Sequence, residues 1–268
     1  MSTLNFNNSS THSYCSDKFT ISYNKTTKKV ETTPKNQVDP LHINSELKTF
    51  ENHALEAYRR AFQDFKPQEI AFCFDGGKDG HVVFHLLKNF ILSLNQPETI
   101  SEIKKSPILI INIVQNSIDL LAEPRNLVIK LTQQFSEFIK YQEYTNLDIK
   151  SALYKLKEDH SDIKAIFMGV RRTDNVWYKN MKIFQKTDQG WPEYVRINPI
   201  VDWSYPCVWA YLLKYKIGYC ELYDEGYTSL GKKSNSVRNE HLKVEVDGEN
   251  FFLPAFCLPS AEFERFKR

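Results

Sequence analysis

The stretch that most constrains the fold is residues 70–87, IAFCFDGGKDGHVVFHLL. Residues 70–74 form an apolar run of strand length, as expected of a strand that is buried on both faces. Two glycines follow, and residues 81–94 then carry apolar residues at helical spacing. A strand, a glycine turn and a helix start gather backbone N–H groups around one point, where the helix dipole favours negative charge. The stretch therefore predicts a phosphate-binding loop.

Each residue type in this loop has a physical reason to contact phosphate. Gly76 and Gly77 can adopt positive φ angles and let phosphate oxygens approach the backbone, and Lys78 offers a mobile cation to the same oxygens. The loop is neither a Walker A sequence, which needs GxxxxGK[ST], nor a GxGxxG sequence. The alternative interpretation is a tight exposed turn without a ligand.

Strands and helices alternate along most of the chain. Strands separated by helices require crossover connections, so we expect an α/β fold with a mainly parallel sheet. The spacing of apolar residues predicts helices at 44–65, 81–94, 127–141, 148–159 and 205–214, and strands at 70–74, 107–114, 163–170 and 196–201.

Composition excludes several classes of function. Of the 268 residues, 41% are hydrophobic and 25% charged, as in an ordinary soluble globular protein, and no apolar run is long enough to cross a bilayer. A net charge of +2 lacks the basic footprint that nucleic-acid binding requires. We therefore expect small-molecule partners, with no nucleic acid and no membrane.

The cysteines and the N-terminal sequence predict a cytoplasmic protein. The five cysteines are widely scattered and form no CxxC pair, which argues against a zinc site or a disulfide framework and for reduced thiols. Residues 1–19 contain no apolar segment of the kind that directs secretion.

Two later stretches carry further chemistry. MGVRRTDN at 168–175 follows a predicted strand, at the end where open α/β sheets build their sites, and its arginines and carboxylate suit a nucleoside triphosphate with its metal ion. QKTDQGWPEYVRINPIVDW at 185–203 holds Asp188, Trp191 and Trp203, which suit a planar heterocycle with an N–H to satisfy. The alternatives are that Asp188 caps a turn and that both tryptophans are core residues.

The order Asp-Gly-Gly-Lys-Asp-Gly at 75–80 resembles the Ser-Gly-Gly-x-Asp-Ser loop of the ATP pyrophosphatase group, which includes enzymes like phosphoadenylyl-sulfate reductase. Taken with five later pieces, the chain resembles the eukaryotic FAD synthetases, also called FMN adenylyltransferases, of the single-domain fungal type. The resemblance covers about residues 45–268. The later pieces are MGVRRTD (168–174), TDQGWP (187–192), RINPIVDWSYPCVW (196–209), LYDEGYTSLG (222–231) and ERFKR (264–268).

The resemblance implies a Rossmann-like fold of the adenine nucleotide alpha hydrolase kind, in which helices cover both faces of a mainly parallel twisted sheet. It implies a nucleotidyltransferase that moves AMP from ATP to the phosphate of FMN with Mg²⁺ and gives FAD and pyrophosphate. The pattern along the chain divides it into a flexible arm (1–43), a nucleotide-binding α/β domain (44–215) and a substrate-binding loop and tail packed on the same domain (216–268).

The resemblance also assigns roles to residues. Asp79 and Asp174 are expected to bind or orient Mg²⁺, which prefers carboxylate and phosphate oxygens. The residues expected at the ATP phosphates are Asp75, Gly76, Gly77, Lys78, Gly169 and Arg171. Those expected at the flavin are Asp188, Trp191, Trp203, Arg265 and Arg268. Those expected to act in catalysis are Lys78, Asp79, Asp174, Arg265 and Arg268.

The loop departs from the family pattern at two positions. Asp75 stands where the family has Asn or Ser, and Gly80 where it usually has a small hydroxyl or thiol side chain. Three other functions stay open: an enzyme like phosphoadenylyl-sulfate reductase, a flavin- or nucleotide-binding protein without turnover, and a thiolating enzyme acting on transfer RNA. The terminal arginines have a solvated chain end as their alternative. We expect a monomer.

Overall fold

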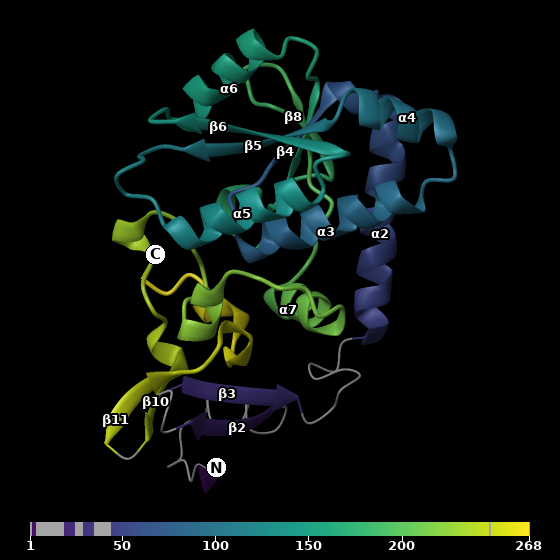
Figure 1. Cartoon of the computed structure of the whole chain (residues 1–268). Helices are drawn as coiled ribbons and strands as arrows, with labels where there is room; N and C mark the ends of the chain where they lie inside the picture. Colours follow the sequence, from purple (N-terminus) through teal and green to yellow (C-terminus); the bar gives the residue numbers. More distant parts are fainter. Residues whose placement is uncertain (1, 4–18, 25–28, 35–43, 247, 268) are drawn as a thin grey trace. The chain divides into compact units, whose positions relative to one another are not determined.

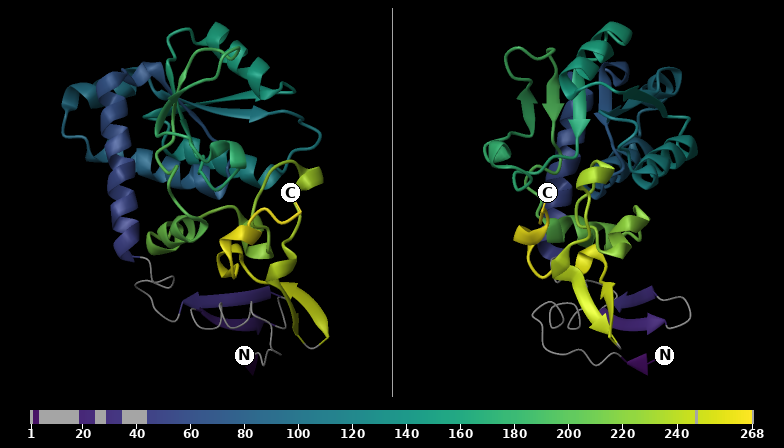
Figure 2. Two further views of the ribbon diagram at one scale, coloured as in Figure 1. Left: turned by 180° about the vertical axis from the view of Figure 1, so that it is seen from behind. Right: turned by 90° about the vertical axis from the view of Figure 1, so that its left-hand side faces the viewer.

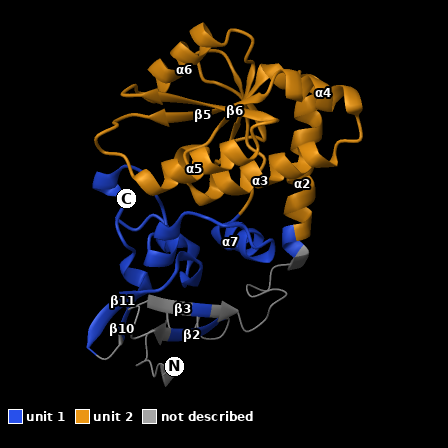
Figure 3. Cartoon of the chain, viewed as in Figure 1, with its two compact units in different colours: residues 1–47, 204–268 blue, residues 48–203 orange. Residues whose placement is uncertain are grey.

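The structure is a computed structural model, and its residues fall into two compact units, 48–203 and 1–47 with 204–268 (Figure 3). The predicted domain ranges of 1–43, 44–215 and 216–268 stay a prediction. The residues that the structure describes are 2–3, 19–24, 29–34, 44–246 and 248–267.

A six-stranded sheet forms the centre of the unit 48–203, in the order β6-β5-β4-β7-β9-β8. All neighbouring strands are parallel except β8, which pairs antiparallel with β9 at one edge. The prediction of a mainly parallel α/β sheet is therefore confirmed. The strands are β4 (Ile70–Cys73), β5 (Ile108–Val114), β6 (Ile139–Thr145), β7 (Ala165–Met168), β8 (Phe184–Lys186) and β9 (Val195–Ile197).

Helices cover both faces of this sheet. Figures 1 and 2 show α6 on one face and α3 and α5 on the other. Ala152 and Leu156 of α6 are fully buried against the sheet. On the other side, the Tyr58 ring of α2 lies 4.7 Å from the Phe167 ring of β7. The helices are α2 (Asn44–Asp64), α3 (Lys78–Ser93), α4 (Pro97–Lys105), α5 (Ala122–Gln134) and α6 (Ile149–Asp159), with 3₁₀ turns η1 (Pro67–Glu69) and η2 (Val176–Tyr178).

One predicted helix, 127–141, is wrong in its second half. The helix α5 ends at Gln134, and residues 139–145 form the strand β6 instead. Phe135 and Phe138, which stand at helical spacing, stack on each other at 4.8 Å in the connection. Because β6 is an edge strand with one mostly polar surface, it lacks the apolar run by which the inner strands are recognised.

The second unit packs around aromatic residues. The Trp209 ring of α7 lies between 5.1 and 6.2 Å from four other rings, those of Tyr205, Tyr219, Tyr223 and Phe256. Its elements are α7 (Tyr205–Lys214), the hairpin β10 (Lys243–Val246) and β11 (Glu249–Phe252), and the 3₁₀ turns η3 (Glu221–Glu225), η4 (Lys233–Asn235), η5 (Glu240–Leu242), η6 (Ala255–Cys257) and η7 (Ala261–Phe263).

The segment 1–43, predicted to be a flexible arm, contains a small antiparallel sheet that its sequence did not predict. The remaining residues of that segment lie outside the described part of the chain, so their predicted flexibility stays a prediction. The strands are β1 (Ser2–Thr3), β2 (Phe19–Asn24) and β3 (Lys29–Pro34).

The cysteines only partly follow the prediction of reduced thiols. Cys73, Cys207 and Cys220 are free, whereas Cys257 is disulfide-bonded. Among the described residues, no helix combines the length and the apolar character that a membrane span needs.

The end of β7 lies directly against the first turn of α3. A Cβ atom built on Gly169 would stand 2.6 Å from the backbone nitrogen of Gly80 and 2.8 Å from its Cα atom. Because both obstructing atoms belong to the backbone, they cannot move aside as a flexible side chain would. Glycine at 169 therefore lets strand and helix meet at the point where the predicted phosphate loop begins its helix.

We predict that Gly169→Ala lowers the free energy of unfolding by about 1–3 kcal/mol, because the added methyl group forces α3 away from β7. Gly218→Ala is the matched control, since no atom lies within 4 Å of its built Cβ. Urea denaturation of both variants measures the effect. Equal stabilities would contradict the close contact between β7 and α3.

Candidate active site

The predicted phosphate loop connects β4 to α3 as a tight turn. Gly76 has a φ angle of +86°, and a Cβ atom at this position would stand 2.2 Å from the carbonyl oxygen of Pro124 in α5. Glycine is thus required both by the backbone conformation and by the space beside α5. The Asp75 carboxylate folds back, so its Oδ1 accepts a hydrogen bond from the Gly77 N–H at 2.9 Å.

The helix α3 begins directly after this turn. Its N-cap residue Gly77 has no side chain to cap the helix. The N-terminus of this 16-residue helix therefore keeps the electropositive character that binds phosphate groups. Gly76 has the positive φ angle that the sequence allowed, whereas Gly77 has a φ angle of −68°, and α3 begins at Lys78 rather than at the predicted His81.

Four charged side chains form a buried cluster at the carboxyl ends of β4 and β7. The Arg171 guanidinium pairs with Asp79 through Nε at 2.9 Å and with Asp174 through a second nitrogen at 2.7 Å. Lys78 Nζ donates to the other oxygen of Asp79 at 2.9 Å. The sequence placed all four residues at the site, and the structure brings them together.

Burial makes this cluster a rigid unit. Arg171 has no exposed surface, and the side chains of Lys78 and Asp174 are only 2% and 7% exposed. Each of the two cations is paired with a carboxylate, which offsets part of the cost of burying these charges. The Arg171 backbone N–H also donates to Asp174 at 2.8 Å, which fixes the carboxylate from two sides. Asp79, at 17% exposure, is the most accessible of the four.

The neighbouring Arg172 has a different role, which the sequence did not reveal. Its Nε donates to Asp202 at 2.6 Å, and another guanidinium nitrogen donates to the carbonyl oxygens of Lys179 and Met181. These bonds close the loop that follows Asp174. One arginine of the pair thus organises the buried carboxylates, and the other fixes the loop that carries one of them.

Gly80 is matched to an aromatic neighbour. A Cβ atom at Gly80 would stand 2.7 Å from the ring of Phe74. The Phe74 ring is 1% exposed and stacks on Phe72 at 5.3 Å and on Phe84 at 5.7 Å. The departure from the family pattern at position 80 is therefore explained by the large side chain that occupies the space of the missing one.

The predicted flavin residues Asp188 and Trp191 lie on one turn. The Trp191 N–H donates to the Asp188 carbonyl oxygen at 3.1 Å, and Gly190 between them has a φ angle of +82°. The Asp188 carboxylate is 69% exposed and stands 3.5 Å from Arg196. The Trp191 indole is 39% exposed. Both side chains are therefore open to a ligand.

Lys150 is a residue of this turn region that the sequence analysis missed. Its ammonium lies 6.0 Å from the centre of the Trp191 ring and 4.0 Å from the position of a Cβ at Gly190. Lys150 belongs to the first turn of α6, which begins just after the carboxyl end of β6. A cation above an exposed indole is a contact that no spacing in the sequence could have indicated.

Trp203 occupies a different environment from the Asp188 turn. Its side chain is 2% exposed and lies 6.2 Å from the Phe50 ring of α2. The core interpretation that the sequence left open describes this packing, and a flavin contact of Trp203 stays a prediction.

The terminal arginines belong to the other unit. Arg265 is exposed, on a tail held by hydrogen bonds from Thr228 to the Glu264 carbonyl and from Asn239 to the Phe263 carbonyl, both at 2.7 Å. The tail up to this point is therefore an ordered turn. Arg268 lies outside the described residues, and the roles of both arginines stay predictions.

Comparison with known proteins shows the family. The model of the phosphoadenosine phosphosulfate reductase domain matches residues 69–238. A probable FAD synthase of Schizosaccharomyces pombe is 34% identical over 209 residues, which cover 78% of this chain and 74% of that protein. The chain belongs to the phosphoadenosine phosphosulfate reductase domain family and, within it, to the FAD synthases. The resemblance predicted from its motifs is confirmed.

Other FAD synthases extend the likeness. A probable FAD synthase of Caenorhabditis elegans is 32% identical over 219 residues, covering 81% of this chain and 40% of that protein. The FMN adenylyltransferase of Candida glabrata, solved in complex with FMN and the ATP analogue AMPCPP, has a TM-score of 0.75 at 21% identity, covering 84% of this chain and 91% of that one. That structural likeness shows the fold of the FAD synthases, which confirms the predicted fold class.

We predict that Gly80→Ala destabilises the FAD synthase fold by about 1–3 kcal/mol, because the new methyl group collides with the Phe74 ring. The double variant Phe74→Leu, Gly80→Ala is expected to lose less than the sum of the two single changes, since the smaller side chain makes room. A double-mutant cycle in urea measures this coupling. Additive losses would show that position 80 is not matched to Phe74.

Proposed function

We propose that this chain is an FMN adenylyltransferase, which transfers the AMP part of ATP to the phosphate of FMN and gives FAD and diphosphate. The observation that carries the proposal is the buried cluster of Lys78, Asp79, Arg171 and Asp174 beside the open start of α3, in a chain of the FAD synthase family. Such a cluster suits a reaction in which the protein positions charged phosphate groups and stabilises their charge, and transfers few protons.

The reaction needs few chemical groups from the protein. An oxygen of the FMN phosphate attacks the α-phosphorus of ATP, a new P–O bond forms, and the bond from the α-phosphorus to the β-phosphate oxygen breaks. Diphosphate leaves with the electron pair of that bond. In our proposal, the Gly76–Gly77 turn and the N-terminus of α3 hold the leaving phosphates.

The residues of the cluster divide this work. Because Arg171 has no exposed surface, we assign it to positioning Asp79 and Asp174 rather than to direct contact with ATP. Lys78, whose side chain is 2% exposed, holds Asp79, and its predicted contact with the phosphates requires its ammonium to become accessible. We retain Arg265 and Arg268 at the phosphates, where guanidinium groups suit two anions that must approach each other.

The donor set fits Mg²⁺. Asp79 and Asp174 offer the carboxylate oxygens that this ion prefers, and an oxygen of one lies within 4.8 Å of an oxygen of the other. Asp79 and Asp174 would therefore hold the ion together with phosphate oxygens. When bound, Mg²⁺ supplies positive charge to the phosphates during transfer.

The flavin ring is assigned to the turn that carries Asp188 and Trp191. The exposed Asp188 carboxylate suits a ring N–H, and the exposed Trp191 indole offers an apolar wall. Lys150, above the indole, would donate to a ring carbonyl oxygen. Trp203 is kept as a predicted contact that requires its side chain to become accessible.

The remaining expectations belong to the same proposal. We infer that FMN and ATP are the partners, that the protein is a monomer, and that it acts in the cytoplasm. The free thiols of Cys73, Cys207 and Cys220 accord with a reducing compartment, whereas the bonded Cys257 does not favour it.

The direct test is incubation of the purified chain with FMN, ATP and Mg²⁺, with FAD resolved by chromatography and diphosphate assayed. Equal amounts of FAD and diphosphate are expected. Binding of flavin without FAD would identify a non-catalytic flavin protein. Sulfite release from phosphoadenylyl sulfate with a thiol reductant, without FAD formation, would identify a reductase.

Within that assay, we predict that Asp174→Asn lowers kcat at least about 100-fold, because the change removes a charge that the cluster holds at the phosphates. Asp64→Asn is the matched control, since this exposed carboxylate at the end of α2 pairs with Arg60 away from the cluster, and it is expected to change kcat less than about fivefold. Similar losses in both variants would contradict the assignment.

A second prediction concerns the departure at Asp75. We expect Asp75→Asn to raise kcat/KM for ATP roughly threefold, because it removes a negative charge near the phosphates while the Oδ1 acceptor for the Gly77 N–H remains. Asp75→Ala, which loses both charge and acceptor, is expected to gain less. An unchanged or lower kcat/KM for Asp75→Asn would show that the Asp75 carboxylate does not repel the phosphates of ATP.

The flavin assignment gives a third prediction. Asp188→Ala is expected to raise KM for FMN about tenfold and to leave KM for ATP unchanged, because a charge-assisted hydrogen bond to the ring is lost. Glu193→Ala, at an 81% exposed carboxylate nearby, is the control. A rise in KM for ATP instead would place Asp188 at the nucleotide.

A further inference from the structure

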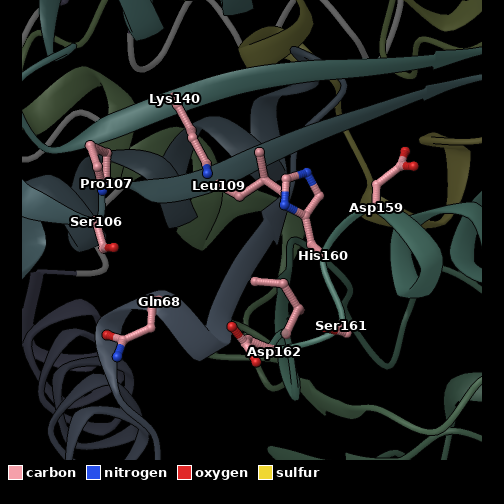
Figure 4. A pocket seen from close by; sticks show the side chains of 10 residues that line it. Gln68, Ser106, Pro107, Leu109, Lys140, Asp159, His160, Ser161 and Asp162 are labelled. Atoms are coloured by element: carbon pink, nitrogen blue, oxygen red, sulfur yellow. The ribbon is translucent and has the colours of Figure 1, made fainter.

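A cavity of about 240 Å³ lies at the amino ends of the sheet strands, away from the site described above (Figure 4). Its walls come from four segments that are far apart in the sequence. They include Gln68 of η1, Ser106 before β5, Lys140 of β6, and His160 and Asp162 in the connection from α6 to β7. Pro107, Leu109 and Ile163 add apolar surface.

The cavity is separate from the proposed active site. The phosphate loop and Arg171 follow the carboxyl ends of β4 and β7, whereas the cavity residues precede or begin the strands. The four residues of β4 alone span about 13 Å. A ligand of the size that this cavity admits cannot occupy both places, so an occupant would be a molecule distinct from the one in the active site.

Backbone bonds fix the walls of the cavity. The His160 N–H donates to the Leu156 carbonyl at the end of α6, and the Ile163 N–H donates to the His160 carbonyl at 3.1 Å. The Lys164 N–H donates to the Glu69 carbonyl of η1 at 2.8 Å, and the two side chains pair at 2.5 Å. The connection and η1 are thus tied together, so the cavity exists before any ligand binds.

Hydrogen bonds also orient the His160 ring. Gln142 Nε2 donates to the Tyr144 hydroxyl at 2.8 Å, so its oxygen faces His160 at 2.7 Å. The His160 Nε2 therefore carries a hydrogen and donates it to Gln142. The other ring nitrogen, Nδ1, stays open to gain a proton when a negative charge comes near.

Lys140 brings an uncompensated positive charge to this wall. Among the described residues, no carboxylate forms an ion pair with Lys140, while Asp159 is engaged by Lys155 at 3.0 Å. Burial lowers the pKa of His160, and the Lys140 ammonium lowers it further, against the opposite effect of Asp159. A positive charge on His160 would be repelled by the Lys140 ammonium. An anion bound between the two groups would offset this repulsion.

The opposite wall has the other polarity. Figure 4 shows Asp162 and Gln68 across the cavity from Lys140. The Asp162 carboxylate is exposed and has no ion-pair partner within the described part of the chain. It suits an ammonium or hydroxyl group. Asp159 also lines the cavity beside His160, where its carboxylate is paired with Lys155 at 3.0 Å. The cavity therefore has the Lys140 ammonium on one wall and the Asp162 carboxylate on the opposite wall, and Ser106 and Ser161 also line it.

We propose that this cavity binds a small phosphate monoester that carries an amino group, with its phosphate at Lys140 and His160 and its ammonium at Asp162. A phosphate offers three acceptor oxygens to the donors on one wall, and the single carboxylate opposite selects the ammonium. The volume is below that of a pocket for a drug-sized molecule, which favours such a small ligand.

The test uses phosphoethanolamine as the probe and the full chain labelled with ¹⁵N and ¹³C. The His160 ring signals, assigned with His160→Gln, are followed by NMR at increasing probe concentration. A saturable shift and a rise in the His160 pKa are expected. Inorganic phosphate is expected to bind at least about tenfold more weakly, because it cannot reach Asp162, and ethanolamine is expected to cause no shift.

Two variants test the contacts of the phosphate end and of the ammonium end of the ligand separately. Lys140→Gln is expected to weaken phosphoethanolamine at least about tenfold, and Lys130→Gln, an exposed charge on α5, to leave it unchanged. Asp162→Asn is expected to weaken phosphoethanolamine but not phosphate. Adenylyl transfer by Lys140→Gln without the probe is expected to match that of the unaltered chain.

The same titration with saturating ATP and Mg²⁺ distinguishes this cavity from the phosphate loop. The His160 shift is expected to persist there, since the two places are separate. Absence of a saturable shift, its loss with ATP, or equal affinity of the Lys140→Gln variant and the unaltered chain would each overturn the proposal.

Discussion

The buried ion pairs of Arg171 are the interaction on which the site depends. One guanidinium group contacts Asp79 at the start of α3 and Asp174 beyond the end of β7, and so fixes two segments that are about ninety residues apart. Leaving any of these charges alone inside the protein would be costly, about 3–5 kcal/mol for a broken buried pair. The strands, the phosphate loop and the loop after Asp174 are therefore held in one arrangement, which a reaction governed by positioning requires.

Close backbone contacts support this arrangement. Gly169 allows β7 to meet α3, and Gly76 allows the loop to meet α5, so three elements converge where the phosphate groups are proposed to bind. Gly80 and Phe74 complete the fit, because the aromatic ring takes the space that a side chain at position 80 would need. The residue at position 80 of the loop is therefore determined by packing against Phe74 as well as by the chemistry of phosphate binding.

Much of this could be predicted from the sequence, because the signals are local. The apolar run and glycines at 70–77 predict β4 and its loop, and the motif at 168–175 places two charged residues of the cluster. The burial of Arg171 and the different role of Arg172 could not be predicted. The sequence does not show that the side chains of two adjacent arginines point in different directions and pair with different carboxylates. The strand β6 was missed because an edge strand needs no apolar run, and the cavity at Lys140 because four distant connections build it.

In the proposed reaction, the groups at the carboxyl edge of the sheet direct the FMN phosphate to the α-phosphorus of ATP. The most direct measurement is to follow ³²P from ATP labelled at either the α- or the γ-phosphorus during turnover with FMN and Mg²⁺. Transfer of AMP to FMN places the α label in FAD and the γ label only in diphosphate. A flavin product labelled from the γ-phosphorus, or α label released as AMP while FMN stays unchanged, would contradict it.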